Sequence, residues 1–184
     1  MTASLYFIAI IPPADICEEI TAIKKDFAAR FNSRHALRLI PHITLKAPFA
    51  LAPASHEAAL RWFVSLDVPR NRFVQRLNNF GCFANKRNPV IFIEPVLEPP
   101  LQHLQQRIVA SFRETFPGVP VPQNEAKFHP HMTVAYRDLS YAGFKKAWEE
   151  YRHKQYVRSF TVDNFSLLQH DQKQWNIVAT SSLE

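Results

Sequence analysis

Two short segments of the chain carry residues that could act together on a phosphate ester. His42 and Thr44 stand two residues apart in an apolar run, and His131 and Thr133 repeat the pattern. A β-strand points residues i and i+2 to the same face, so each segment would present an imidazole beside a hydroxyl. An ordinary histidine side chain has a pKa of about 6.5, so at neutral pH one ring can be a neutral general base while the other is a protonated general acid. Hydroxyl donors can bind the oxygens on which charge develops. The pair of segments predicts metal-free phosphoester chemistry.

The same pattern has a purely structural explanation. A single His-x-Thr would more often be an ordinary strand position beside a β-branched residue. Two copies on matching faces, in matching places of a repeated chain, favour a site, because a structural duplication has no need to keep both residue types.

The elements that must position these residues occur twice. Each half is expected to contain a strand, a Pro-Pro pair, a helix, the His-x-Thr strand, a second helix and two strands. His42 and His131 are 89 positions apart, and the Pro-Pro pairs at 12–13 and 99–100 are 87 apart. Such a nearly constant offset indicates an internal repeat.

Apolar periodicity gives the bounds of these elements. Strands are expected at 5–11, 37–46, 72–83, 89–96, 126–136, 157–169 and 174–181. Helices are expected from Asp15 to Phe31, at 55–66, from Leu101 to Phe116 and at 141–152. The sequence therefore predicts an α+β fold: a bilobal pseudo-two-fold repeat with two mainly antiparallel sheets around a central cleft and helices packed outside. Residues 1–184 are expected to form one domain of two intertwined lobes, with strands exchanged between them.

The tetrapeptides His-Ile-Thr-Leu at 42–45 and His-Met-Thr-Val at 131–134 resemble the paired His-x-Thr-x motifs of the two-histidine (2H) phosphoesterase superfamily. The nearest resemblance is to the bacterial 2′-5′ RNA ligase or RNA 2′,3′-cyclic phosphodiesterase group. It implies catalysis by His42 and His131 and phosphate binding by Thr44 and Thr133. It also implies that the second-motif histidine is the base where the product is a 2′-phosphate; otherwise the two roles stay open.

One position departs from the family pattern. Many relatives carry an arginine five residues after the second histidine, where this chain has Tyr136, and Arg137 follows one residue later. Strand alternation would place Arg137 on the face of His131, so it either replaces the usual cation or ends the strand at the surface. The same rule makes Lys46 either a phosphate contact or a solvated lysine.

Further substrate contacts are weaker candidates. Phe49 and Tyr136 flank the motifs and could stack on a base, although most of the 15 phenylalanines must be core. His129 with His131 could suggest a metal, but no dense carboxylate cluster supports one. No cofactor and no metal are expected.

Composition narrows the class of partner. A net charge of +6 favours RNA or a nucleotide, here one with a cyclic phosphate. Only three glycines occur, which excludes glycine-rich phosphate loops. No apolar run approaches a membrane span, and Cys17 and Cys82 are expected to be reduced thiols, so a cytoplasmic protein is expected. The sequence does not determine the oligomeric state, for which a monomer is the expectation.

The function predicted from the sequence is hydrolysis of 2′,3′-cyclic phosphates of RNA ends or nucleotides, without a metal, by a cyclic phosphodiesterase. Two alternatives stay open: a binding module of the same fold that holds a nucleotide or RNA without turnover, and joining of RNA ends through a 2′-5′ bond.

Overall fold

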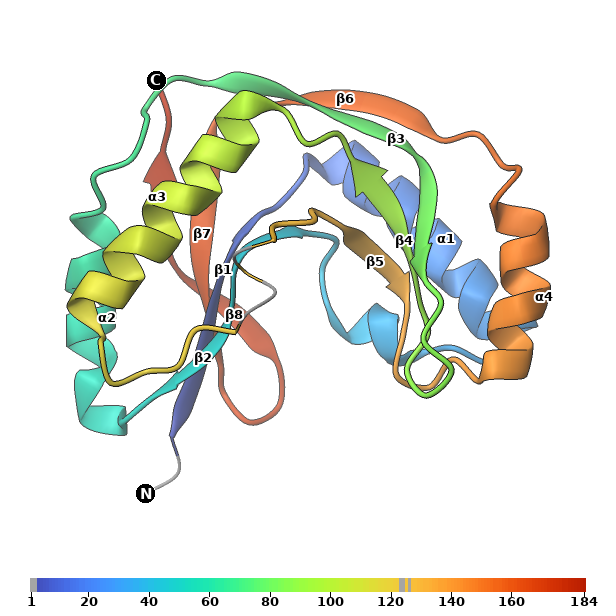
Figure 1. Ribbon diagram of the computed structural model, residues 1–184, viewed down its shortest axis with the longest axis horizontal. Coiled ribbons are helices and arrows are strands. Elements are labelled where there is room, and N and C mark those ends of the chain that lie inside the picture. Colours follow the sequence, from blue (N-terminus) through green and yellow to red (C-terminus); the bar gives the residue numbers. More distant parts are fainter. Residues whose placement is uncertain (1–2, 123–124, 126) are drawn as a thin grey trace.

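Figure 1 shows the computed structural model, which describes residues 3–122, 125 and 127–184. The chain folds into two four-stranded sheets with helices outside them. The strands are β1 (Ser4–Ile10), β2 (Ile43–Leu51), β3 (Phe73–Phe83), β4 (Val90–Pro95), β5 (Met132–Ala135), β6 (Val157–Val162), β7 (Asn164–His170) and β8 (Trp175–Ser182). The helices are α1 (Ala14–Arg30), α2 (His56–Val64), α3 (Pro99–Thr115) and α4 (Tyr141–Tyr151), with short 3-10 helices η1 (His35–Arg38) and η2 (Pro53–Ser55).

Each sheet places at its edge the strand that directly follows one motif histidine. The strand orders are β2-β1-β7-β8 and β5-β4-β3-β6, and every neighbouring pair is antiparallel. β1 with β2 in one sheet therefore corresponds to β4 with β5 in the other. The predicted α+β class with two antiparallel sheets is confirmed. Strand exchange is also present, because β3 follows α2 but lies beside β4 in the second sheet.

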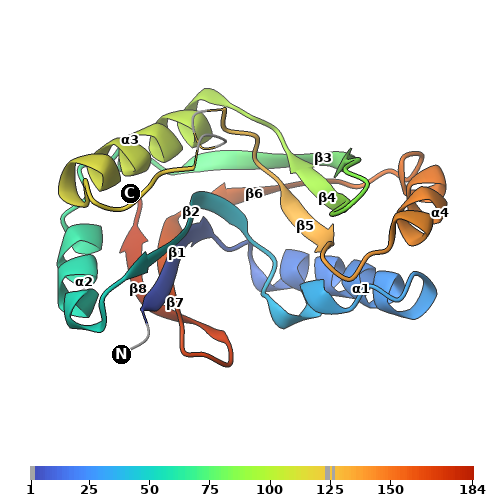
Figure 2. The ribbon, with the colours of Figure 1, turned by 60° about the horizontal axis from the view of Figure 1, so that its bottom comes forward.

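The crossover helices lie across the two halves. α1 connects β1 to β2 yet packs against β5, and α3 connects β4 to β5 yet packs against β2. Figures 1 and 2 show this exchange, with α1 beside β5 and α3 over the end of the molecule that holds β2. Each edge strand is thus supported by a helix from the other half. That residues 1–184 form one domain stays a prediction.

Local sequence explains where the helices begin and which face they bury. Pro13 precedes α1, Pro99 and Pro100 occupy the first turn of α3, and proline suits that position because its missing N–H needs no partner there. Ile16, Ile20 and Phe27 recur at helical spacing and are buried in the core.

Three predicted strand bounds are wrong. Residues 37–42 are not a strand: η1 forms instead, because the Asp138 carboxylate binds the backbone N–H groups of Arg34 and His35, at 2.8 Å each. Of the predicted strand 126–136, residue 126 lies outside the described residues, and β5 covers Met132–Ala135; Pro130 has no N–H to donate before it, and Arg137 has a positive φ of 61° after it. The single strand expected at 157–169 is two, because the chain changes sheets at Asp163.

None of the helices in the described residues combines the length and the apolar character that a membrane crossing requires. Cys17 and Cys82 are both free thiols.

Candidate active site

The two histidines occupy equivalent positions at the entrances of the two edge strands. His42 directly precedes β2, and His131 directly precedes β5. The Nδ1 atom of His42 lies 2.7 Å from the Ile40 carbonyl oxygen, and Nδ1 of His131 lies 2.9 Å from the His129 carbonyl oxygen. A carbonyl oxygen only accepts hydrogen bonds, so both rings carry a proton on Nδ1. In each neutral ring Nε2 therefore keeps its lone pair, which is the form a general base needs.

A cleft between the sheets brings the predicted residues together. His42, Thr44 and Thr133 line one cavity of about 350 Å³. His131 is not among its lining residues, but a positive charge on His131 reaches His42 and lowers the pKa of that ring. The His131 ring lies against Phe83 and Phe92, with centroids 5.3 and 5.6 Å away. Residues of both motifs thus lie close to one cavity, and they come from opposite sheets.

Burial favours the uncharged form of both imidazoles. It is the largest cause that lowers the pKa of His42 to about 4, and the charges of Lys24 and His131 act in the same direction. Burial also lowers the pKa of His131, and the charge of His129 adds to that effect. At neutral pH the unliganded cleft holds two neutral rings, so protonating one of them requires a nearby anion.

The remaining lining gives the cleft a positive charge. Lys24, Arg38, Arg137 and Lys173 all contribute to the cavity wall, and none of the described residues that line it is acidic. Lys24 is 2% exposed, donates to the Leu39 carbonyl at 2.8 Å and has its pKa lowered by burial to about 8. An anion would therefore find several cations and no competing carboxylate on the walls.

The prediction that Lys46 faces the cleft is wrong. Lys46 is fully buried, and its Nζ atom lies 3.0 Å from Oε1 of Glu125, which also accepts the backbone N–H of Ala47 at 2.6 Å. The cause is a register shift in β2: Ala9 pairs with Thr44 and Ile8 with Lys46, so Leu45 is an extra residue. This bulge turns Lys46 away from the face that Thr44 shares with His42.

Two other candidates lie away from the cavity. Phe49 is 3% exposed and packs on Phe112 in the core, with ring centroids 4.6 Å apart, so it offers no surface for stacking. His129 is exposed outside the cavity lining, with Nε2 3.6 Å from Oε1 of Glu94. Neither residue lines the cavity that contains His42.

Tyr136 and Arg137 do line the cleft. Strand alternation did not place Arg137 there, because β5 ends at Ala135 and the backbone of Arg137 adopts a left-handed conformation. Its Nη1 atom lies 3.2 Å from Nε2 of His35. The side chain thus reaches the site through a turn.

Several lining residues had no motif to identify them. Phe7 lies in the apolar β1, yet its ring is 5.1 Å from that of His42 and 4.6 Å from that of Trp175. Trp175 belongs to the β7–β8 hairpin, which also contributes His170, Lys173 and Gln174 to the wall. A mixed aromatic and basic hairpin is only a weak signal in one sequence, since its distance from His42 depends on the return of β7 to β1.

Within the described residues, no three His, Cys, Asp or Glu side chains form a group that could hold a metal ion. The polar side chains that line the cavity include imidazoles, hydroxyls and the cations of lysine and arginine.

Comparisons with known proteins agree with this architecture. Residues 12–174 match the 2′-5′ RNA ligase superfamily. A Bacillus cytotoxicus protein named "Putative phosphoesterase" is 29% identical over 177 residues, which cover 96% of this chain and 95% of the relative. A crystal structure of a Thermus thermophilus protein has a TM-score of 0.66 at 16% identity and 97% coverage of both chains. E. coli LigT complexed with 3′-AMP has a TM-score of 0.61 at 21% identity and 98% coverage of both chains.

The family match spans most of the chain and includes both His-x-Thr segments. The chain belongs to the 2′-5′ RNA ligase superfamily, the two-histidine phosphoesterases.

Proposed function

We propose that this protein hydrolyses 2′,3′-cyclic phosphates of RNA ends or nucleotides by general acid–base catalysis between His42 and His131. The observation that carries the proposal is the shared tautomer: each Nδ1 is fixed to a carbonyl two residues upstream, so each Nε2 is free to exchange a proton. A pure binding module would not need this arrangement in both halves.

The proposed reaction is a single displacement at phosphorus. A water oxygen attacks as the Nε2 atom of one neutral histidine removes its proton. The bond from phosphorus to one ribose oxygen breaks, and the other, protonated histidine donates its Nε2 proton to that oxygen. Thr44 and Thr133 donate hydrogen bonds to the non-bridging oxygens, where negative charge is concentrated. The product is a ribose phosphomonoester.

Binding of the anionic substrate would favour protonation of one of the two histidines. Burial lowers the pKa of both rings, and a bound phosphate anion acts in the opposite direction because it stabilises an imidazolium beside it. Which ring becomes the acid depends on the ribose oxygen that leaves. The identity of the product, a 2′- or a 3′-phosphate, therefore assigns the two roles.

The aromatic wall suits a nucleoside. Trp175 is half-buried, lines the cleft and meets Phe7 edge-on, which leaves it as a surface against which a base could lie. The 3′-AMP in the related E. coli LigT structure supports a nucleotide ligand for this fold.

The test is turnover of a nucleoside 2′,3′-cyclic phosphate by the wild type and by His42→Asn, His131→Asn and His129→Asn. The side-chain amide of asparagine can replace the Nδ1–H group of histidine as the donor to the carbonyl two residues upstream. Each of the first two variants should lose about 10²–10⁴-fold in kcat. His129→Asn is the matched control in the same His-Pro-His segment and should stay near the wild type.

Added chelator should leave the rate unchanged. Equal rates for the wild type and both site variants would refute the proposal. Nucleotide binding without turnover would instead support the binding-module alternative, and formation of a 2′-5′ linkage from RNA ends would support the ligase alternative.

A further inference from the structure

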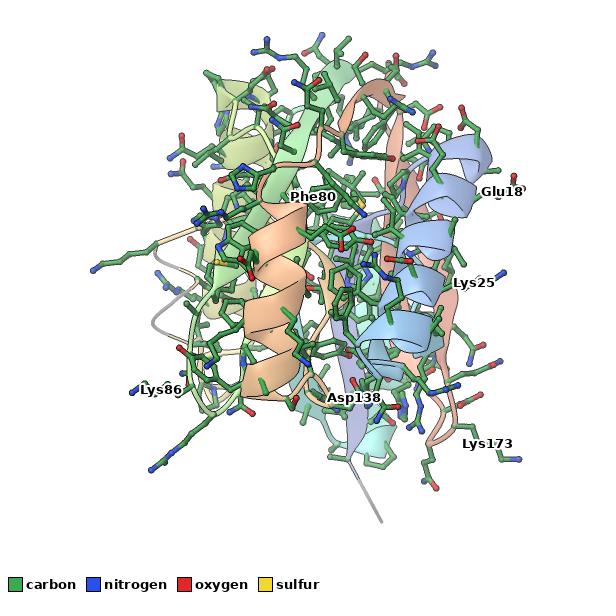
Figure 3. All side chains as sticks on the ribbon, turned by 90° about the vertical axis from the view of Figure 1, so that its right-hand side faces the viewer. Glu18, Lys25, Phe80, Lys86, Asp138 and Lys173 are labelled. Atoms are coloured by element: carbon green, nitrogen blue, oxygen red, sulfur yellow. The ribbon has the colours of Figure 1, made fainter. Side chains whose placement is uncertain are left out.

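The 3-10 helix η1 is fastened to the end of β5 by one carboxylate. Asp138 accepts the Ser33 hydroxyl at 2.9 Å and the backbone N–H groups of Arg34 and His35 at 2.8 Å each. These donors engage both carboxylate oxygens. Figure 3 shows Asp138 at the same end of the molecule as Lys86 and Lys173, whose side chains extend into solvent. The contact holds η1 against the turn that carries Arg137.

This fastening gathers three basic side chains on one wall of the cleft, the η1 cluster: His35, Arg38 and Arg137. A guanidinium only donates hydrogen bonds, so Arg137 donates to Nε2 of His35 across 3.2 Å. The His35 ring also lies edge-on to Tyr136, with centroids 5.0 Å apart. All members of the cluster line the cavity that contains His42.

The cluster carries more positive charge than the one carboxylate beside it, Asp138, whose charge acts on His35. Among the described residues, neither Arg38 nor Arg137 forms an ion pair with a carboxylate. The two carboxylate oxygens of Asp138 accept hydrogen bonds from Ser33 and from the η1 backbone. Two guanidinium groups beside a single carboxylate leave a net positive charge on a concave wall, which attracts an anion, and arginine geometry suits phosphate.

The catalytic phosphate does not account for this charge. A cyclic phosphodiester carries one negative charge, and the two histidines and two threonines already address it. The cavity wall holds four lysine and arginine side chains. Thr133 and Arg137 are four residues apart, which is at most ~13 Å along an extended chain, so the cluster lies a short distance from the reacting phosphate.

We propose that the η1 cluster binds a second phosphate of the substrate, the 5′-phosphate of the nucleotide that carries the cyclic phosphate. In an RNA end this group is the phosphodiester to the preceding nucleotide. The natural substrate class is then an oligonucleotide end or a 5′-phosphorylated nucleotide, and a nucleoside cyclic phosphate is a minimal substrate. The inference rests on the proposed function for the position of the first phosphate.

A binding experiment tests the second site without catalysis. Calorimetry compares adenosine 3′-monophosphate with adenosine 3′,5′-bisphosphate on the wild type, Arg38→Gln, Arg38→Lys and Arg34→Gln. The wild type should bind the bisphosphate about tenfold more tightly, as one charge-assisted contact allows. Arg38→Gln should lose most of that ratio, and Arg38→Lys should keep part of it. Arg34→Gln is the matched control, because it removes an exposed neighbouring charge whose side chain is outside the cavity lining.

Salt dependence gives a second measurement. The slope of log affinity against log salt should be steeper for the bisphosphate in the wild type, and Arg38→Gln should reduce that slope by about 0.7, the value for one single-strand phosphate contact.

The outcomes separate the two proposals. Equal binding of the two nucleotides by the wild type, equal preference in Arg38→Gln and Arg34→Gln, or no binding of either nucleotide would each overturn the second phosphate site. Absence of cyclic-phosphate turnover, with the tenfold ratio and its loss in Arg38→Gln intact, would overturn the proposed reaction and leave the second site supported.

Discussion

Burial of His42 in its neutral form should make the stability of the fold fall in mild acid. The folded-state pKa of this ring is about 4, against an ordinary value of about 6.5 in an unfolded chain. Between these values the unfolded state binds more protons than the folded state, so the free energy of unfolding decreases as the pH falls. The full shift is worth about 3 kcal/mol, and about 2 kcal/mol of it should be lost between pH 8 and pH 5.

The perturbation that isolates this contribution is His42→Asn, which removes the titrating ring. Urea unfolding, followed by tryptophan fluorescence, would give the free energy of unfolding at pH 8 and pH 5 for the wild type and the variant. The wild type should lose about 2 kcal/mol more than His42→Asn over this interval. The comparison cancels the titration of the other histidines. His103→Asn, which removes an exposed imidazole from α3, is the matched control and should keep the wild-type loss.

Adding inorganic phosphate provides a second test of the pKa of His42. An anion bound beside His42 stabilises the imidazolium, so phosphate should reduce the difference between the wild type and His42→Asn at pH 5. If the difference is below about 0.5 kcal/mol without phosphate, which is small for any single buried group, the ring is not held neutral by burial. The substrate-assisted protonation proposed above would then lose its basis.

Three further changes test the surroundings of the site. Replacing Glu125 by Gln leaves the buried Lys46 ammonium without a counter-charge and should cost about 3–5 kcal/mol in urea unfolding; a loss near zero would show that the pair is dispensable. Gly81→Ala would place a Cβ atom 2.4 Å from Phe92 Cε2 and should cost about 1–3 kcal/mol, measured as a lower unfolding midpoint. Trp175→Ala should raise the KM for a nucleoside cyclic phosphate about tenfold with a smaller change in kcat, as loss of base stacking predicts; an unchanged KM would exclude that contact.

Sequence patterns predicted the features of the fold that do not depend on contacts between distant residues. The order of helices and strands depends on periodicities that single segments carry, and the repeat depends on comparing two halves of the sequence. Non-local contacts decided the rest. Lys46 points inward because of a bulge against β1, and η1 replaces the expected strand because of Asp138, about a hundred residues away. Neither cause is visible in the segment it affects.

The residues that the β7–β8 hairpin adds to the cleft could not be predicted, because their position depends on the strand order. Trp175 and Lys173 line the same cavity as His42 because β7 returns to the first sheet and pairs with β1. A repeat read from the sequence places corresponding strands in corresponding lobes, and it gives no reason to expect the last hairpin beside the first motif.

Exchange of the crossover helices explains how two separate sheets can hold one reaction geometry. α1 precedes the strand of His42 but packs on the strand of His131, and α3 does the reverse. Lys24 extends this link: it lies on α1, and it donates to the Leu39 carbonyl immediately before the segment that fixes the His42 ring. A displacement of β5 would therefore move α1 and, through Lys24, the entrance of β2. The proposed general acid–base reaction at one phosphorus atom would need two groups held at a constant separation, and a fold in which each half supports the strand of the other would favour it.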